Sequence, residues 1–93
     1  MVPMPNIRFP IYKSSMTIGR GSDSDIRLRR KYISRCHARV TEDESRVRIE
    51  DLGSKNGLYV NEQPVKDYSY LHNGDVVDIG EVQLCYLEDA QAA

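Results

Sequence analysis

The sequence has few cysteines and no long apolar segment. Its two thiols, Cys36 and Cys85, are too few for a disulfide framework and too far apart for a C-x-x-C zinc site. We therefore expect reduced structural thiols and neither a metal nor another cofactor. No apolar run approaches the ~20 residues that span a bilayer, which excludes a membrane-spanning role. The first nine residues show no apolar segment typical of a secretory signal, so an intracellular protein is expected.

Charge is unevenly distributed along the chain. The 93 residues suffice for one domain, and the formal net charge is only −1. Basic residues nevertheless concentrate in one segment, and this predicts an anionic partner, although most charge clusters are simply solvated. Seven of the thirteen basic residues lie between positions 20 and 39: Arg20, Arg27, Arg29, Arg30, Lys31, Arg35 and Arg39.

Apolar residues at alternate positions predict several short strands. Turn signals such as GRGSDSD, TEDES and LGSKNG separate them at short intervals, which is typical of an all-β sandwich or barrel with mostly antiparallel strands. We assign residues 7–88 to this domain, 1–6 to an irregular N-terminal segment and 89–93 to a frayed tail. The alternating runs are Ile7, Phe9 and Ile11; Ala38 and Val40; Val47 and Ile49; and Val82, Leu84 and Tyr86.

The stretch YISRCHARV, residues 32–40, contains a Ser and a His three positions apart. In a hydrolase Ser34 would be the nucleophile, His37 the base and Asp51 the acid that orients the base. The sequence lacks the G-x-S-x-G elbow, and the cations beside Ser34 suit a bound dianion better than an acyl-transfer transition state. We therefore predict that the chain is not an enzyme.

Four short motifs follow one another in the chain: IGR, SRCHA, GSKNG and NGDVVDIG. In this order and spacing, from about Met16 to Leu87, the chain resembles the forkhead-associated (FHA) domain family. The resemblance implies a β-sandwich of two mostly antiparallel twisted sheets, with the binding site in loops at one end. It also implies a non-catalytic module that recognises phosphothreonine in partner proteins.

The resemblance assigns roles to individual donors. A phosphothreonine carries about −1.5 to −2 charge and three acceptor oxygens, so its site needs hydrogen-bond donors. By likeness to the family, Arg20 and Ser34 bind the phosphate, and Arg35 makes a further contact. Lys55 occupies a position that is often Thr or Ser. Asn56 matches the residue that bonds the peptide backbone beside the phosphothreonine.

Other residues are expected to support this site. The resemblance implies that His37 is buried and braces the loop that carries the Ser, while Gly19 and Gly57 allow loops to approach closely. The segment RRKYI precedes that Ser, and in some family members this loop selects residues of the partner beyond the phosphothreonine. Lys31 and Tyr32 are the candidates for this specificity loop.

Two alternatives use the basic segment 27–39 differently. It could contact the phosphates of a nucleic acid, but the net charge of −1 and the lack of an aromatic platform make this partner unlikely. It could also serve a phosphate-independent protein interaction, against which the intact Arg20, Ser34 and Asn56 argue.

Two further expectations concern context and assembly. Many proteins with this domain act in nuclear DNA-damage and cell-cycle signalling, so the resemblance implies a nuclear location. IRFPIY, residues 7–12, is expected to be the first strand, at an edge because Pro10 cannot donate a hydrogen bond. An incomplete sandwich would expose apolar surface there and near Val82, Leu84 and Tyr86, which predicts a homodimer.

Overall fold

The computed structural model describes residues 9–88, which form nine strands in two sheets and no helix. The fold is therefore the all-β sandwich that the sequence predicts. No described segment could cross a membrane as an apolar helix. The expectations for residues 1–6 and 89–93, and for Ile7 in the first strand, lie outside the described residues.

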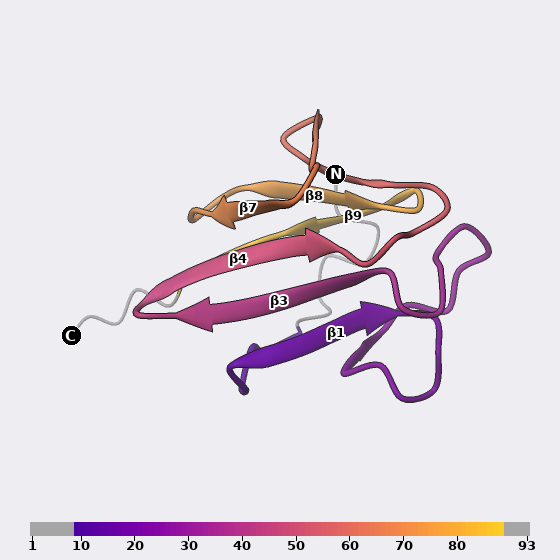
Figure 1. The fold of residues 1–93 in the computed structure, drawn as a ribbon, viewed down its shortest axis with the longest axis horizontal. Helices are drawn as coiled ribbons and strands as arrows, with labels where there is room; N and C mark the ends of the chain where they lie inside the picture. Colours follow the sequence, from indigo (N-terminus) through magenta and orange to yellow (C-terminus); the bar gives the residue numbers. More distant parts are fainter. Residues whose placement is uncertain (1–8, 89–93) are drawn as a thin grey trace.

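One sheet has the strand order β2-β1-β3-β4-β7. Its only parallel pair is β1 with β2, and the other neighbours are antiparallel. The long hairpin β3–β4 lies at its centre (Figure 1). The strands are β1 (Ser15–Gly19), β2 (Ile26–Arg27), β3 (Ala38–Asp43), β4 (Arg46–Asp51) and β7 (Tyr68–Leu71).

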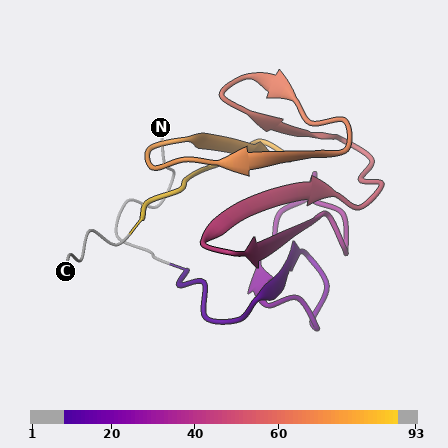
Figure 2. The same ribbon diagram turned by 60° about the vertical axis from the view of Figure 1, so that its left-hand side comes forward.

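The second sheet has the order β6-β5-β8-β9 and is antiparallel throughout. Figure 2 shows its hairpin β8–β9, in orange to yellow, lying above the magenta hairpin β3–β4 of the first sheet. The strands are β5 (Leu58–Val60), β6 (Gln63–Pro64), β8 (Val76–Ile79) and β9 (Val82–Cys85).

The core consists of the inward-facing residues of both sheets. In β3, Ala38 and Val40 are buried while Arg39 between them is exposed, which is the alternation expected from the sequence. Each large aliphatic side chain removed from water stabilises the fold by about 1.5–3 kcal/mol. The buried apolar residues are Met16, Ile18, Ile26, Leu28, Ile33, Ala38, Val40, Ile49, Leu58, Val60, Leu71, Val77, Ile79 and Val82.

Strand directions sort the loops between two ends of the sandwich. Strands β1, β4 and β8 finish at the same end, where segments 20–37, 52–57 and 80–81 gather, on the right in Figure 1. The turns at 44–45, 61–62 and 72–75 lie at the opposite end. The polar motifs that the sequence singled out are therefore collected at one end, with the exception of Asn73-Gly74.

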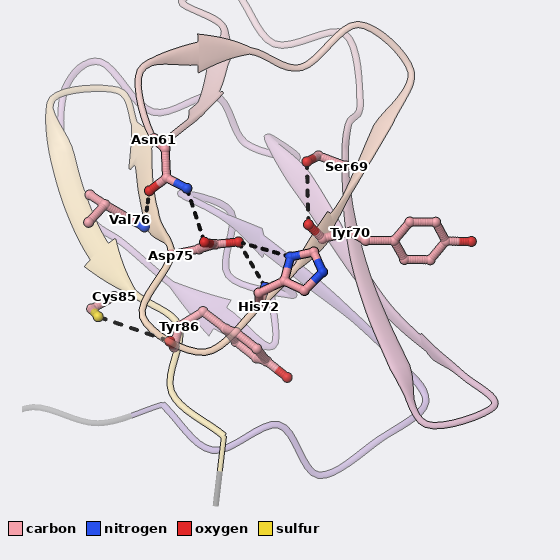
Figure 3. Close-up of polar contacts among 8 residues, drawn as sticks. All are labelled: Asn61, Ser69, Tyr70, His72, Asp75, Val76, Cys85 and Tyr86. Carbon is pink, nitrogen blue, oxygen red and sulfur yellow. Dashed lines mark hydrogen bonds and ion pairs between the residues drawn. The ribbon is translucent and has the colours of Figure 1, made fainter.

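Asp75 organises the opposite end, as Figure 3 shows. Its carboxylate accepts hydrogen bonds from the Asn61 side-chain amide at 3.0 Å and from the His72 N–H at 2.8 Å. The Asn61 bond, followed by the His72 bond, lowers the pKa of Asp75 below its ordinary value. Gly74 has φ = 91°, a conformation that suits glycine, so the Asn73-Gly74 motif is a structural turn.

The N-terminal strand expected at residues 7–12 is not present in its described part. Residues 9–12 have no strand pairing, because Pro10 lacks an N–H and alternation alone supplies no partner strand. Val82 is buried, and Leu84 and Tyr86 pack against the core. The apolar surface expected near β9 is therefore partly covered within the chain, whereas Phe9, Ile11 and Tyr12 stay exposed.

Candidate functional site

The end of β1 is joined to the segment that carries SRCHA. The Arg20 N–H donates to the Ser34 carbonyl at 2.9 Å, and the Gly21 N–H donates to the Arg35 carbonyl at 3.1 Å. A Cβ on Gly19 would overlap the Arg35 carbonyl oxygen, so only glycine permits this approach. The Gly-Arg motif thus sets the distance between two loops.

A carbonyl oxygen holds the Arg20 side chain in place. Its Nε donates to the Ile33 carbonyl at 2.9 Å, while the side chain stays exposed. The two terminal nitrogens, with four N–H groups, remain available at the surface. The hydrogen bond thus orients the Arg20 guanidinium while its terminal nitrogens stay available to an anion.

His37 is the one buried polar residue of the described chain, with an exposed fraction of 0%. Its Nδ1 accepts from the Ser34 N–H at 3.1 Å, so Nε2 carries the proton and donates to the Gly57 carbonyl at 2.7 Å. The imidazole therefore connects two loops whose bonded residues are 23 positions apart. The resemblance implies a bracing role for this His, which stays a prediction that these two hydrogen bonds support.

Two further hydrogen bonds join these loops, one through a side chain of each loop. The Ser34 Oγ accepts from the Lys55 N–H at 3.1 Å, which leaves its own hydrogen free for an outside acceptor. The Asn56 side-chain amide donates to the Tyr32 carbonyl at 2.8 Å and keeps its oxygen and second hydrogen. Gly57 has φ = 86°, as the Asn-Gly turn predicts.

The expected specificity loop lies exposed beside these donors. The Lys31 ammonium lies 5.6 Å from the centre of the Tyr32 ring, and both side chains are accessible. Beneath them, a Cβ on the buried Gly80 would overlap the Tyr32 backbone. The β8–β9 turn therefore supports the loop from below.

The geometry does not assemble a hydrolase triad. Neither imidazole nitrogen of His37 is free to accept the Ser34 hydroxyl proton, since Nδ1 accepts a backbone N–H and Nε2 is a donor. Asp51 accepts from the Ser54 N–H at 2.9 Å. Within residues 9–88 no group of His, Cys, Asp and Glu side chains could hold a metal ion. Both cysteines are free and exposed, so the expectation that they are structural is wrong.

Five predicted binding residues thus come together at one end of the sandwich: Arg20, Ser34 and Arg35 from one segment, and Lys55 and Asn56 from the other. Sequence reasoning missed the Ile33 carbonyl that holds Arg20, the Ser54 hydroxyl that accepts from the Gly57 N–H at 3.0 Å, and Gly80. A carbonyl has no sequence signal. Gly80, at the end of NGDVVDIG, could have been found as a turn glycine.

Residues 16–80 match the family model described as the FHA domain. The chain therefore belongs to the FHA domain family, whose members are binding modules rather than enzymes. An FHA domain solved in a study of phosphothreonine-dependent interactions has a TM-score of 0.82 and 32% identity, covering 87% of this chain and 83% of that one. EmbR of Mycobacterium tuberculosis, solved with a low-affinity phosphopeptide, has a TM-score of 0.85 and 28% identity, covering 91% and 22%.

Several curated relatives come from bacteria. The oxoglutarate dehydrogenase inhibitor of Corynebacterium jeikeium is 37% identical, over 98% of this chain and 62% of its own length. The glycogen accumulation regulator GarA of Mycobacterium tuberculosis is 40% identical, over 91% and 52%. The chain thus spans between half and two thirds of these relatives. The nuclear location expected from the resemblance is wrong, because these relatives belong to organisms without a nucleus. The relatives likewise give no support to the expected role in nuclear DNA-damage and cell-cycle signalling.

Proposed function

We propose that this domain binds phosphothreonine in a partner protein through Arg20, Ser34, Arg35, Lys55 and Asn56. The observation that carries the proposal is the joining of two loops by His37, which holds the Ser34 hydroxyl beside the Lys55 backbone. Around this point the free groups are donors apart from the Asn56 side-chain oxygen. No ion pair within the described residues neutralises the cations among them. Such a site suits an acceptor-rich dianion.

The energies are sufficient for discrimination. Each charge-assisted hydrogen bond to the phosphate contributes about 1.5–3 kcal/mol net. Two or three of them separate a phosphorylated peptide from its unphosphorylated form by orders of magnitude in affinity. The Asn56 oxygen and second amide hydrogen bond the backbone of an extended peptide, which contributes affinity without reading sequence.

The names of the bacterial relatives suggest where the partner belongs. One group is named for inhibition of oxoglutarate dehydrogenase and another for regulation of glycogen accumulation. We propose that the protein is a bacterial metabolic regulator, with oxoglutarate dehydrogenase as the first candidate partner. Inhibition of that enzyme by the purified protein would support this assignment, and unchanged activity with a saturating amount would reject it.

The basic segment 27–39 supports the alternatives less well. Leu28, Ile33 and Ala38 within it are buried, and Arg39 lies on the face of the first sheet, paired with Glu50 at 3.4 Å. Arg39 is therefore paired and does not belong to a basic surface that a nucleic acid could contact. We do not extend the proposal to a homodimer, since residues 9–12 form no edge strand and Val82 is buried within the chain.

Titration calorimetry with matched phosphothreonine and threonine peptides tests the proposal. Only the phosphorylated peptide should bind, and Arg20→Ala or Ser34→Ala should abolish its binding with little change in Tm. Arg29→Ala removes an exposed charge outside the site and should keep the affinity within about twofold. Equal binding of both peptides would favour a phosphate-independent interaction, and full affinity in a folded Arg20→Ala variant would overturn the assignment.

A further inference from the structure

Three arginines line one cleft beside the proposed phosphate site. The cleft has a volume of about 520 Å³, and its walls are formed by Arg20, Gly21, Ser22, Asp23, Arg27 and Arg35. Ser34, Lys55 and Asn56 are not part of its lining. The cleft therefore extends away from the loop at 52–57, toward the edge strand β2.

Arg27 is oriented in the same way as Arg20. Its Nε donates to the Arg20 carbonyl at 3.0 Å, and its side chain is exposed. The four N–H groups on its terminal nitrogens remain free for an anion. The guanidinium groups of Arg20 and Arg27 thus lie at the ends of neighbouring strands, and a backbone carbonyl holds each of them through Nε.

The cations of this region exceed what one phosphothreonine neutralises. Arg20, Arg27 and Arg35 have no ion-pair partner within residues 9–88, and Asp23 is the one carboxylate that lines the cleft. With Lys55, the local charge is four positive minus one negative, or +3. A phosphothreonine brings about −1.5 to −2, so roughly one positive charge remains unbalanced.

We propose that the cleft is a second anion subsite, with Arg27 as its principal donor, and that it binds an acidic side chain of the same partner peptide. This rests on the proposed phosphothreonine binding. Neighbouring strands lie ~4.8 Å apart and an extended peptide advances ~3.3 Å per residue. The second acid therefore lies about one to three residues from the phosphothreonine, on the side directed away from Asn56. A second phosphorylated residue and an Asp or Glu share this chemistry.

Calorimetry with three kinds of phosphothreonine peptide tests the subsite. The first peptide has neutral residues on both sides of the phosphothreonine. A second set carries one Glu at each of the three positions before and after it, and a third set carries a second phosphothreonine at these positions. At low salt we expect the acid on one side to raise affinity about five- to tenfold, with a smaller gain at high salt. A larger gain from the second phosphate identifies a doubly phosphorylated partner, and an equal gain identifies Asp or Glu.

Arg27→Gln should remove this gain and keep the affinity for the neutral-flank peptide within about twofold. Arg29→Gln removes the same charge from a neighbouring residue outside the cleft and should retain the gain. A gain that persists in Arg27→Gln overturns the inference. An equal loss of affinity for the neutral-flank and the acidic peptides also overturns it, because Arg27 would then bind the phosphate of the phosphothreonine. If the wild-type chain binds no phosphothreonine peptide, the proposed function itself fails, which is a different result from binding without a gain.

Discussion

Replacing His37 by Ala tests how the two site loops are held together. The substitution leaves the Ser34 N–H and the Gly57 carbonyl without their imidazole partner, and it leaves a cavity where the ring was fully buried. An unsatisfied buried group costs about 1–3 kcal/mol. Two such groups would cost about 2–6 kcal/mol. Because Ser34 and Gly57 are half-buried, we expect the free energy of unfolding to fall by about 2–4 kcal/mol.

That loss is a large part of the 5–15 kcal/mol that stabilises a typical domain. In a domain of this size each kcal/mol lowers Tm by about 4–8 °C, so the variant should melt at least ~8 °C below the wild type. At a temperature where it is still folded, it should bind phosphopeptide more weakly, since Ser34 and the loop at 52–57 are no longer joined.

His72→Ala is the matched control. The His72 side chain is 81% exposed, so the same substitution there should change stability by no more than about 0.5 kcal/mol. Thermal and urea unfolding of both variants, alongside peptide titration, decides the role. A His37→Ala protein that melts like His72→Ala and yet cannot bind would refute the reasoning and mean that His37 contacts the ligand.

Three further predictions concern other parts of the domain. Gly19→Ala should lower both Tm and phosphopeptide affinity, because its Cβ overlaps the Arg35 carbonyl. Gly21→Ala should have a smaller effect, because its Cβ would lie 3.2 Å from the Arg35 carbonyl oxygen, and equal losses of Tm and affinity in the two variants would contradict this. Because the pKa of Asp75 is lowered on folding, its carboxylate stabilises the fold above the unfolded pKa of about 3.9, and this contribution is lost as pH falls through the folded pKa. In Asp75→Asn, the free energy of unfolding in urea should therefore depend less on pH between about pH 2 and 6. An unchanged pH dependence would exclude this carboxylate as its source. Tyr32→Ala should alter the preference of a phosphothreonine peptide library, and an identical profile would remove this side chain from the specificity loop.

Local patterns were enough for part of this protein. Alternation predicted β3, β4 and β9, since one face of each strand must be buried while the other meets water. Asn56-Gly57 is typical of a turn with positive φ, and Gly57 has φ = 86° because glycine adopts that conformation without strain. The order and spacing of four motifs identified the family, and with it the residues that gather at one end of the sandwich.

Tertiary structure decided what depends on contacts between distant segments. The alternating runs did not mark β1, β5, β7 and β8, and these strands form because neighbouring strands complete their hydrogen bonds. IRFPIY shows the reverse case, since its described residues alternate but pair with nothing. The orientation of Arg20 and Arg27 depends on carbonyl oxygens, which every residue has and no sequence pattern marks. The bridge from Ser34 through His37 to Gly57 likewise exists only once the fold brings both loops to the same end.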